Sequence, residues 1–101
     1  MANKEQLKIL KQGVAAWNAW RVEHPDAKID LRGAKFDWKD LSGVNFRNVD
    51  IRGANFRFTS LEGADFNEAN LGLYQDNRTI IYITCFDYSD LTGAYFDIVF
   101  L

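Results

Sequence analysis

The chain has 101 residues, of which 48% are hydrophobic and 26% charged, a composition typical of one soluble globular domain. Its net charge of −2 excludes a strongly basic nucleic-acid-binding protein, and its single cysteine excludes a disulfide framework or a zinc site with several thiolates. No apolar run is long enough to cross a bilayer, and the polar first residues lead into no signal-peptide core. We therefore expect a cytoplasmic protein with neither a membrane nor a nucleic acid as partner.

The first predicted element is a helix over residues 4–23. Apolar side chains recur along it at helical spacing, at Leu7, Leu10, Val14 and Trp17. Asn3 is a suitable N-cap for this helix, and Pro25 is expected to stop it.

From residue 31 onward, every fifth residue is large and apolar, with one exception at Asp76. The series reads Leu31, Phe36, Leu41, Phe46, Ile51, Phe56, Leu61, Phe66, Leu71, Asp76, Ile81, Phe86, Leu91, Phe96 and Leu101. A period of five suits neither an α-helix nor a flat strand, because such residues would not share one face of either. It suits a chain that turns a corner every five residues, so that four corners complete a coil of twenty.

The hexapeptides at 31–36, 51–56 and 61–66 (LRGAKF, IRGANF and LEGADF) resemble the pentapeptide-repeat family. The resemblance covers residues 29–101 and implies an all-β solenoid, a right-handed quadrilateral β-helix of about four coils. Residues 1–28 then form an N-terminal capping helix and linker, similar to those of cyanobacterial members. The family has no single biochemical activity.

With twenty residues per coil, residues twenty apart are expected to stack at about 4.8 Å. The predicted inward columns are Leu31/Ile51/Leu71/Leu91, Phe36/Phe56/Asp76/Phe96, Leu41/Leu61/Ile81/Leu101 and Phe46/Phe66/Phe86. Glycine follows the aliphatic corners but not the Phe corners, so we expect the two kinds of corner to turn differently. A carboxylate at Asp76 would be costly inside, which predicts a loop excursion near 73–79 that is either structural or functional.

Two outward columns are candidate surfaces. The first is a candidate interaction surface of Trp38, Phe58, Arg78 and Ile98, with Tyr95 close by. Its large aromatic side chains invite a partner, unless the N-terminal segment or the excursion covers them. The second is a charged column of Asp30, Asp50, Asn70 and Asp90, which we expect Arg32 and Arg52 to neutralise.

Catalytic, cofactor and metal sites have no candidate residues. The one histidine, His24, is expected on the surface, and Cys85 is expected to be a free thiol. We therefore expect no enzyme and no cofactor, but an interaction or scaffold module for an unknown protein partner. The alternative, which the family resemblance implies, is a DNA-mimicking regulator of a type II topoisomerase. Residues 29–101 carry only eleven acids against seven bases, which is a weak imitation of DNA.

The C-terminal end of the solenoid is a candidate dimer interface, formed by Leu91, Phe96, Phe100 and Leu101. An uncovered last coil would expose apolar side chains and unpaired backbone groups, and two such ends can cover each other. The alternatives are a longer natural chain and a self-capped end.

Overall fold

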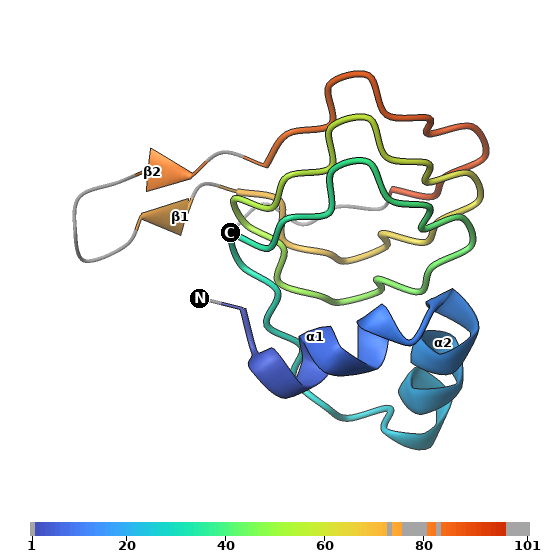
Figure 1. The fold of residues 1–101 in the computed structure, drawn as a ribbon. Helices are drawn as coiled ribbons and strands as arrows, with labels where there is room; N and C mark the ends of the chain where they lie inside the picture. The colour runs from blue at the N-terminus through green and yellow to red at the C-terminus, as the bar shows by residue number, and fades with distance from the viewer. Residues whose placement is uncertain (1, 73, 76–80, 83, 97–101) are drawn as a thin grey trace.

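The computed structural model describes residues 2–72, 74–75, 81–82 and 84–96. Within these ranges it has two helices, α1 (Lys4–Lys11) and α2 (Val14–Glu23), and an antiparallel pair of strands, β1 (Tyr74–Gln75) and β2 (Ile81–Tyr82). The rest of the chain winds into stacked coils, and the two helices lie against one end of the stack (Figure 1).

Each coil has four sides, because parallel bridges between residues twenty apart occur every five residues. The bridges of the first coil to the second are Asp30–Asp50, Lys35–Asn55, Asp40–Ser60 and Asn45–Asp65. The period of five therefore does mark the corners. The expectation of an all-β chain needs one correction, because the described coils contain isolated bridge residues in place of regular strands. Each side contributes a single bridge residue, since the chain turns again before a strand can form.

The two kinds of corner are more alike than predicted. At the aliphatic corner, Ala34 donates its N–H to the Leu31 carbonyl at 3.2 Å, with Gly33 at φ 69° between them. At the Phe corner, Lys39 donates to the Phe36 carbonyl at 3.3 Å, again across a residue with positive φ. The prediction that the two corners turn differently is therefore wrong. At both, the residue two positions after the inward one has a left-handed backbone, and this residue is glycine only at the aliphatic corners.

The core is a stack of inward phenylalanine and aliphatic side chains. Phe46, Phe56 and Phe66 are fully buried, as predicted. Phe56 packs face to face between Phe36 and Phe86, with ring centroids 5.1 Å away on each side. The coil thus encloses a continuous aromatic core with no pore.

The predicted excursion is present, but it is longer than the predicted residues 73–79. Its described part is the hairpin of β1 and β2, which projects from one side of the stack (Figure 1). Asp50 still pairs with Asn70, twenty residues on, whereas Asn55 pairs with Cys85, thirty residues on. The excursion therefore adds ten residues, which is two repeats. Every fifth residue after it consequently still occupies an inward position.

This shift of ten residues corrects the predicted columns beyond residue 72. Phe86 lies beneath Phe56 and Phe96 beneath Phe66, with ring centroids 5.1 and 4.9 Å apart. Leu91 follows the Ser60–Asp90 bridge, so it lies under Leu61 rather than under Leu71. Each side carries three layers in the described residues, so the stack has about three coils rather than four. The side chains of Asp76 and Ile81, and all of Leu101, lie outside the described residues.

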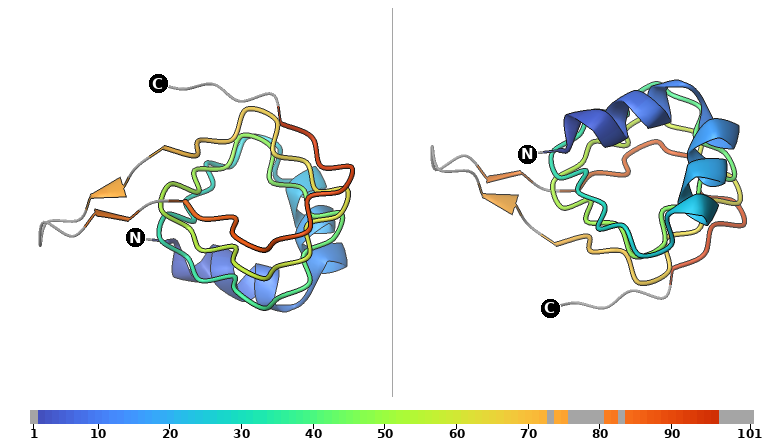
Figure 2. Two further views of the ribbon diagram at one scale, coloured as in Figure 1. Left: turned by 90° about the horizontal axis from the view of Figure 1, so that it is seen from above. Right: turned by 90° about the horizontal axis from the view of Figure 1, so that it is seen from below.

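The predicted helix is broken into two at Gln12 and Gly13, where Gly13 has a φ of 116°. Asn3 caps α1 as predicted, accepting the Gln6 N–H at 3.0 Å. Seen from below, α1 and α2 lie along two adjacent sides of the square (Figure 2). The break lets one amphipathic segment turn the corner and follow the first coil. Within the described residues, neither helix is long and apolar enough to cross a membrane.

Candidate interaction surface

Three aromatic rings stack on the outside of the coil, one from each layer. Trp38 and Phe58 have centroids 4.2 Å apart, and Phe58 and Tyr88 have centroids 4.9 Å apart, with interplanar angles of 5° in both pairs. Trp38 is 73% exposed, Phe58 37% and Tyr88 77%. We call these three residues the aromatic ladder. Three large exposed rings side by side make this surface the candidate contact site of the molecule.

The backbone at the ladder is held in a conformation that aromatic residues rarely adopt. Trp38, Phe58 and Tyr88 have φ values of 65°, 55° and 59°. For a bulky L-residue, this left-handed conformation costs about 1–2 kcal/mol, whereas asparagine tolerates it more easily. Asn48 occupies the equivalent position at another Phe corner of the same coil. The corner itself therefore does not require aromatic side chains.

The ladder is held by backbone hydrogen bonds to the next coil and presents mainly ring edges to a partner. Trp38 donates its N–H to the Arg57 carbonyl and Phe58 donates to the Asp87 carbonyl, each at 3.1 Å. Because the rings face one another, only the outer faces of the two terminal rings are left open. Ring edges carry partial positive charge, so they favour carbonyl oxygens or the faces of other aromatic rings.

The residues predicted for this surface are only partly brought together. Trp38 and Phe58 are neighbours and exposed, but Tyr88 occupies the place that was predicted for Arg78. Arg78 and Ile98 lie outside the described residues. Tyr95 pairs with Asp65 on a different side of the coil and does not belong to the ladder. Sequence reasoning missed Tyr88 because it counted twenty residues through the excursion.

The charged column holds three of its four predicted members. Asp30, Asp50 and Asn70 bridge in succession, but Asp90 pairs with Ser60 on another side. The arginines neutralise the column as predicted. Arg32 contacts Asp30 and Arg52 contacts Asp50, each pair with 2.8 Å between nitrogen and oxygen. Hydrogen bonds from the Arg32 side chain lower the pKa of Asp30 below its usual range.

The residues considered for chemistry lie apart. His24 is exposed and stacks on Trp20 with 4.8 Å between ring centroids, whereas Cys85 is half-buried on a side of the third coil. Among the described residues, no group of three His, Cys, Asp or Glu side chains is arranged to hold a metal ion.

The last described coil is less well covered than the coils before it. Phe96 is 41% exposed and Leu91 half-buried, whereas Phe66 and Leu61 in the layer above are fully buried. The other two residues predicted for a dimer end, Phe100 and Leu101, lie outside the described residues.

Comparison with known families agrees with this geometry. The family model for pentapeptide repeats matches residues 29–68, with eight copies of the repeat. No curated protein matches the chain.

Proposed function

We propose that this chain, of which residues 29–68 match the pentapeptide-repeat family, is a non-enzymatic module that binds another protein through the aromatic ladder. The observation that carries this proposal is the stack of Trp38, Phe58 and Tyr88, exposed at positions where the backbone disfavours aromatic residues. Three aromatic rings at strained positions are hard to explain by packing alone, because they cover little of the core. Because the rings already stack on one another, less side-chain freedom is left to lose on binding.

The family supplies the finer description of the fold, a right-handed quadrilateral β-helix. We further propose that α1 and α2 cap the first coil and that a second copy of the chain covers the last described coil. The exposed Phe96 and half-buried Leu91 support such a homodimer. We also propose a cytoplasmic location for the protein.

Mimicry of DNA is the weaker candidate. Three coils at about 4.8 Å make a rod of about 14 Å, along which B-DNA would carry about eight negative charges. Residues 29–101 carry a net charge of −4, and the arginines of the charged column neutralise part of it. We therefore expect no inhibition of DNA supercoiling by a type II topoisomerase, and potent inhibition would reverse this ranking.

The proposal is tested by affinity capture from an extract of the source cell. The bait is either the wild type or a variant with Trp38→Asn, Phe58→Asn and Tyr88→Asn, which keeps a residue that tolerates positive φ. The matched control is Glu68→Asn, at an exposed corner that also has positive φ. We expect the wild type and the control to capture the same partner and the ladder variant to lose it. Capture of the same proteins by all three baits would contradict the proposal.

A further inference from the structure

The first coil has an edge that no preceding coil covers. In the second coil, Asn55 donates its N–H to the Ala34 carbonyl at 2.9 Å and Ser60 donates to the Lys39 carbonyl at 3.0 Å. These N–H groups point toward the helical end of the stack. The equivalent N–H groups of the first coil point the same way, and they must find partners in the helices or remain unpaired.

On one side, α1 supplies the partners for this edge. Asp30 donates its N–H to the Gln6 Oε1 at 2.9 Å, and its carbonyl accepts the Asn3 N–H at 2.7 Å. These two bonds replace the bonds that a preceding coil would make.

On the adjacent side, α2 does the same. Asn45 donates its N–H to the Asn18 Oδ1 at 2.8 Å, and its carbonyl accepts the Trp17 Nε1–H at 2.8 Å. The other two sides of the first coil carry Lys35 and Asp40. Their backbone N–H groups have no hydrogen-bond partner in the part of the chain that the structure describes.

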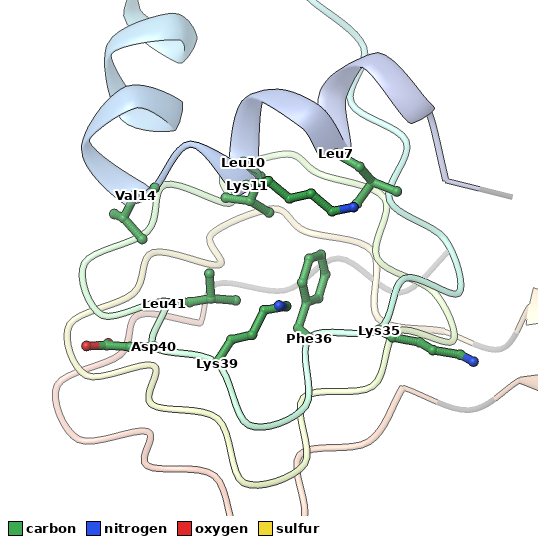
Figure 3. Close-up of a pocket in the computed structure, with 10 residues that line it drawn as sticks. Leu7, Leu10, Lys11, Val14, Lys35, Phe36, Lys39, Asp40 and Leu41 are labelled. Atoms are coloured by element: carbon green, nitrogen blue, oxygen red, sulfur yellow. The ribbon is translucent and has the colours of Figure 1, made fainter.

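A cavity of about 290 Å³ lies at these two sides, between the first coil, α1 and the start of α2 (Figure 3). Its apolar walls are formed by Leu7, Leu10, Val14, Phe36 and Leu41. This volume is at the lower end of the range for small-molecule sites. The cavity thus joins an apolar interior to two unpaired backbone donors.

The charged residues around the cavity are mostly cationic. Figure 3 shows the side chains of Lys11 and Lys39 extending into the space between α1 and the coil, while Lys35 points away. Neither Lys11 nor Lys39 forms an ion pair with any residue that the structure describes. The one acid in the lining, Asp40, accepts hydrogen bonds from the Ser42 N–H and hydroxyl at 3.0 and 2.7 Å.

We propose that this cavity binds a small carboxylate with an apolar body, of the size of a medium-chain fatty acid. The apolar body packs against Leu7 and Val14, the half-buried apolar side chains of the lining. The carboxylate lies near the ammonium groups of Lys11 and Lys39. Charge-assisted hydrogen bonds from these lysines fix its orientation. This site is separate from the ladder and does not depend on the function proposed for it.

Calorimetric titration of the full chain with decanoate tests the proposal. We expect saturable binding with one site, weaker binding of decanol, and no binding of decyltrimethylammonium. Replacement of both lysines, Lys11→Gln and Lys39→Gln, should weaken binding of decanoate at least about tenfold. The control is Lys8→Gln, an exposed lysine on α1 that pairs with Glu5 and does not line the cavity.

Amide chemical shifts locate the site independently of these variants. Decanoate should shift the amide resonances of Lys35 and Asp40, while those of Asn55 and Ser60, whose N–H groups are already bonded, should move little. Val14→Phe, which fills the cavity, should abolish binding while the chain stays folded. Three results would overturn the proposal: no binding at millimolar decanoate, equal binding to the lysine variant, or shifts confined to the aromatic ladder.

Discussion

Replacement of Phe56 by alanine removes the side chain at the centre of the aromatic core. Phe56 is fully buried and contacts four other rings. Its centroid lies 5.1 Å from those of Phe36 and Phe86, and 6.1 and 5.8 Å from those of Phe46 and Phe66. Phe56 thus has a ring stacked on each of its two faces and two further ring contacts with the neighbouring column of phenylalanines.

The magnitude follows from this burial. A buried Phe→Ala change costs about 3–5 kcal/mol, and the four ring contacts place Phe56 in the upper part of that range. A domain of this size has about 5–15 kcal/mol of stability, so the variant loses a large part of it. A loss of 1 kcal/mol lowers the Tm by about 4–8 °C in small domains, which predicts a fall of at least about 15 °C.

Thermal and urea unfolding, followed by circular dichroism and tryptophan fluorescence, measure the change. Phe96→Ala is the matched comparison, because Phe96 is 41% exposed and stacks on one layer only, so it should cost about 1–2 kcal/mol. A Phe56→Ala variant that unfolds like the wild type, or no more easily than Phe96→Ala, would refute the inward placement of every fifth residue.

Three further predictions concern the excursion, the charged column and the open end. Deletion of residues 73–82 combined with Ile83→Gly restores the twenty-residue spacing. The free energy of unfolding should change by less than about 2 kcal/mol, since shortening a surface loop has a small entropic effect. A deletion variant that is unfolded by circular dichroism would contradict this prediction. Hydrogen bonds lower the pKa of Asp30 in the folded chain, so its contribution to stability is present above the unfolded pKa and lost as the pH falls below about 4. In urea titrations at several pH values, the free energy of unfolding of Asp30→Asn should therefore fall less steeply with acid than that of the wild type. An equal fall in both proteins would argue against the ion pair with Arg32. Light scattering at high micromolar concentration should show a dimer for the wild type and a monomer for Phe96→Lys, whereas a monomeric wild type would exclude the dimer.

The five-residue period was sufficient to predict the corners and the core, because each inward position depends only on local spacing. Phe46 and Phe66 are buried for this reason, and so is Leu61. The spacing could not reveal how many residues leave the coil. An excursion of ten residues contains two whole repeats, so Leu91 and Phe96 remain in phase whichever layer they meet.

The ladder was half predicted for the same reason. Trp38 and Phe58 are twenty residues apart within uninterrupted repeats, but Tyr88 is thirty residues from Phe58. A local signal was present nonetheless, because all three residues follow an inward phenylalanine by two positions. Spacing relative to the nearest inward residue survives an excursion, whereas spacing counted along the chain does not.

In the helical segment, the sequence pattern could not predict the bend. Its apolar spacing predicted one helix through Gly13, and the spacing is satisfied equally well by two helices with a bend between them. The bend is imposed by the square first coil, where α1 binds the Asp30 side and α2 the Asn45 side. At Lys35 and Asp40, α1 lies over the coil without pairing with the backbone N–H groups of these two residues, and no local sequence pattern indicates this cavity.

The aromatic ladder exists only if Tyr88 lies in the layer next to Phe58. The native Cys85 allows a direct measurement of which residue of the preceding coil lies beside it. The structure pairs Cys85 with Asn55, whereas an uninterrupted count of twenty places it beside Asp65. Residues paired across neighbouring strands have Cα atoms close enough for a disulfide. Under mild oxidation, Asn55→Cys should form an intramolecular disulfide with Cys85, detected by mass spectrometry of the digested protein, and Asp65→Cys should not. A disulfide in the Asp65→Cys variant alone would contradict the register and, with it, the aromatic ladder.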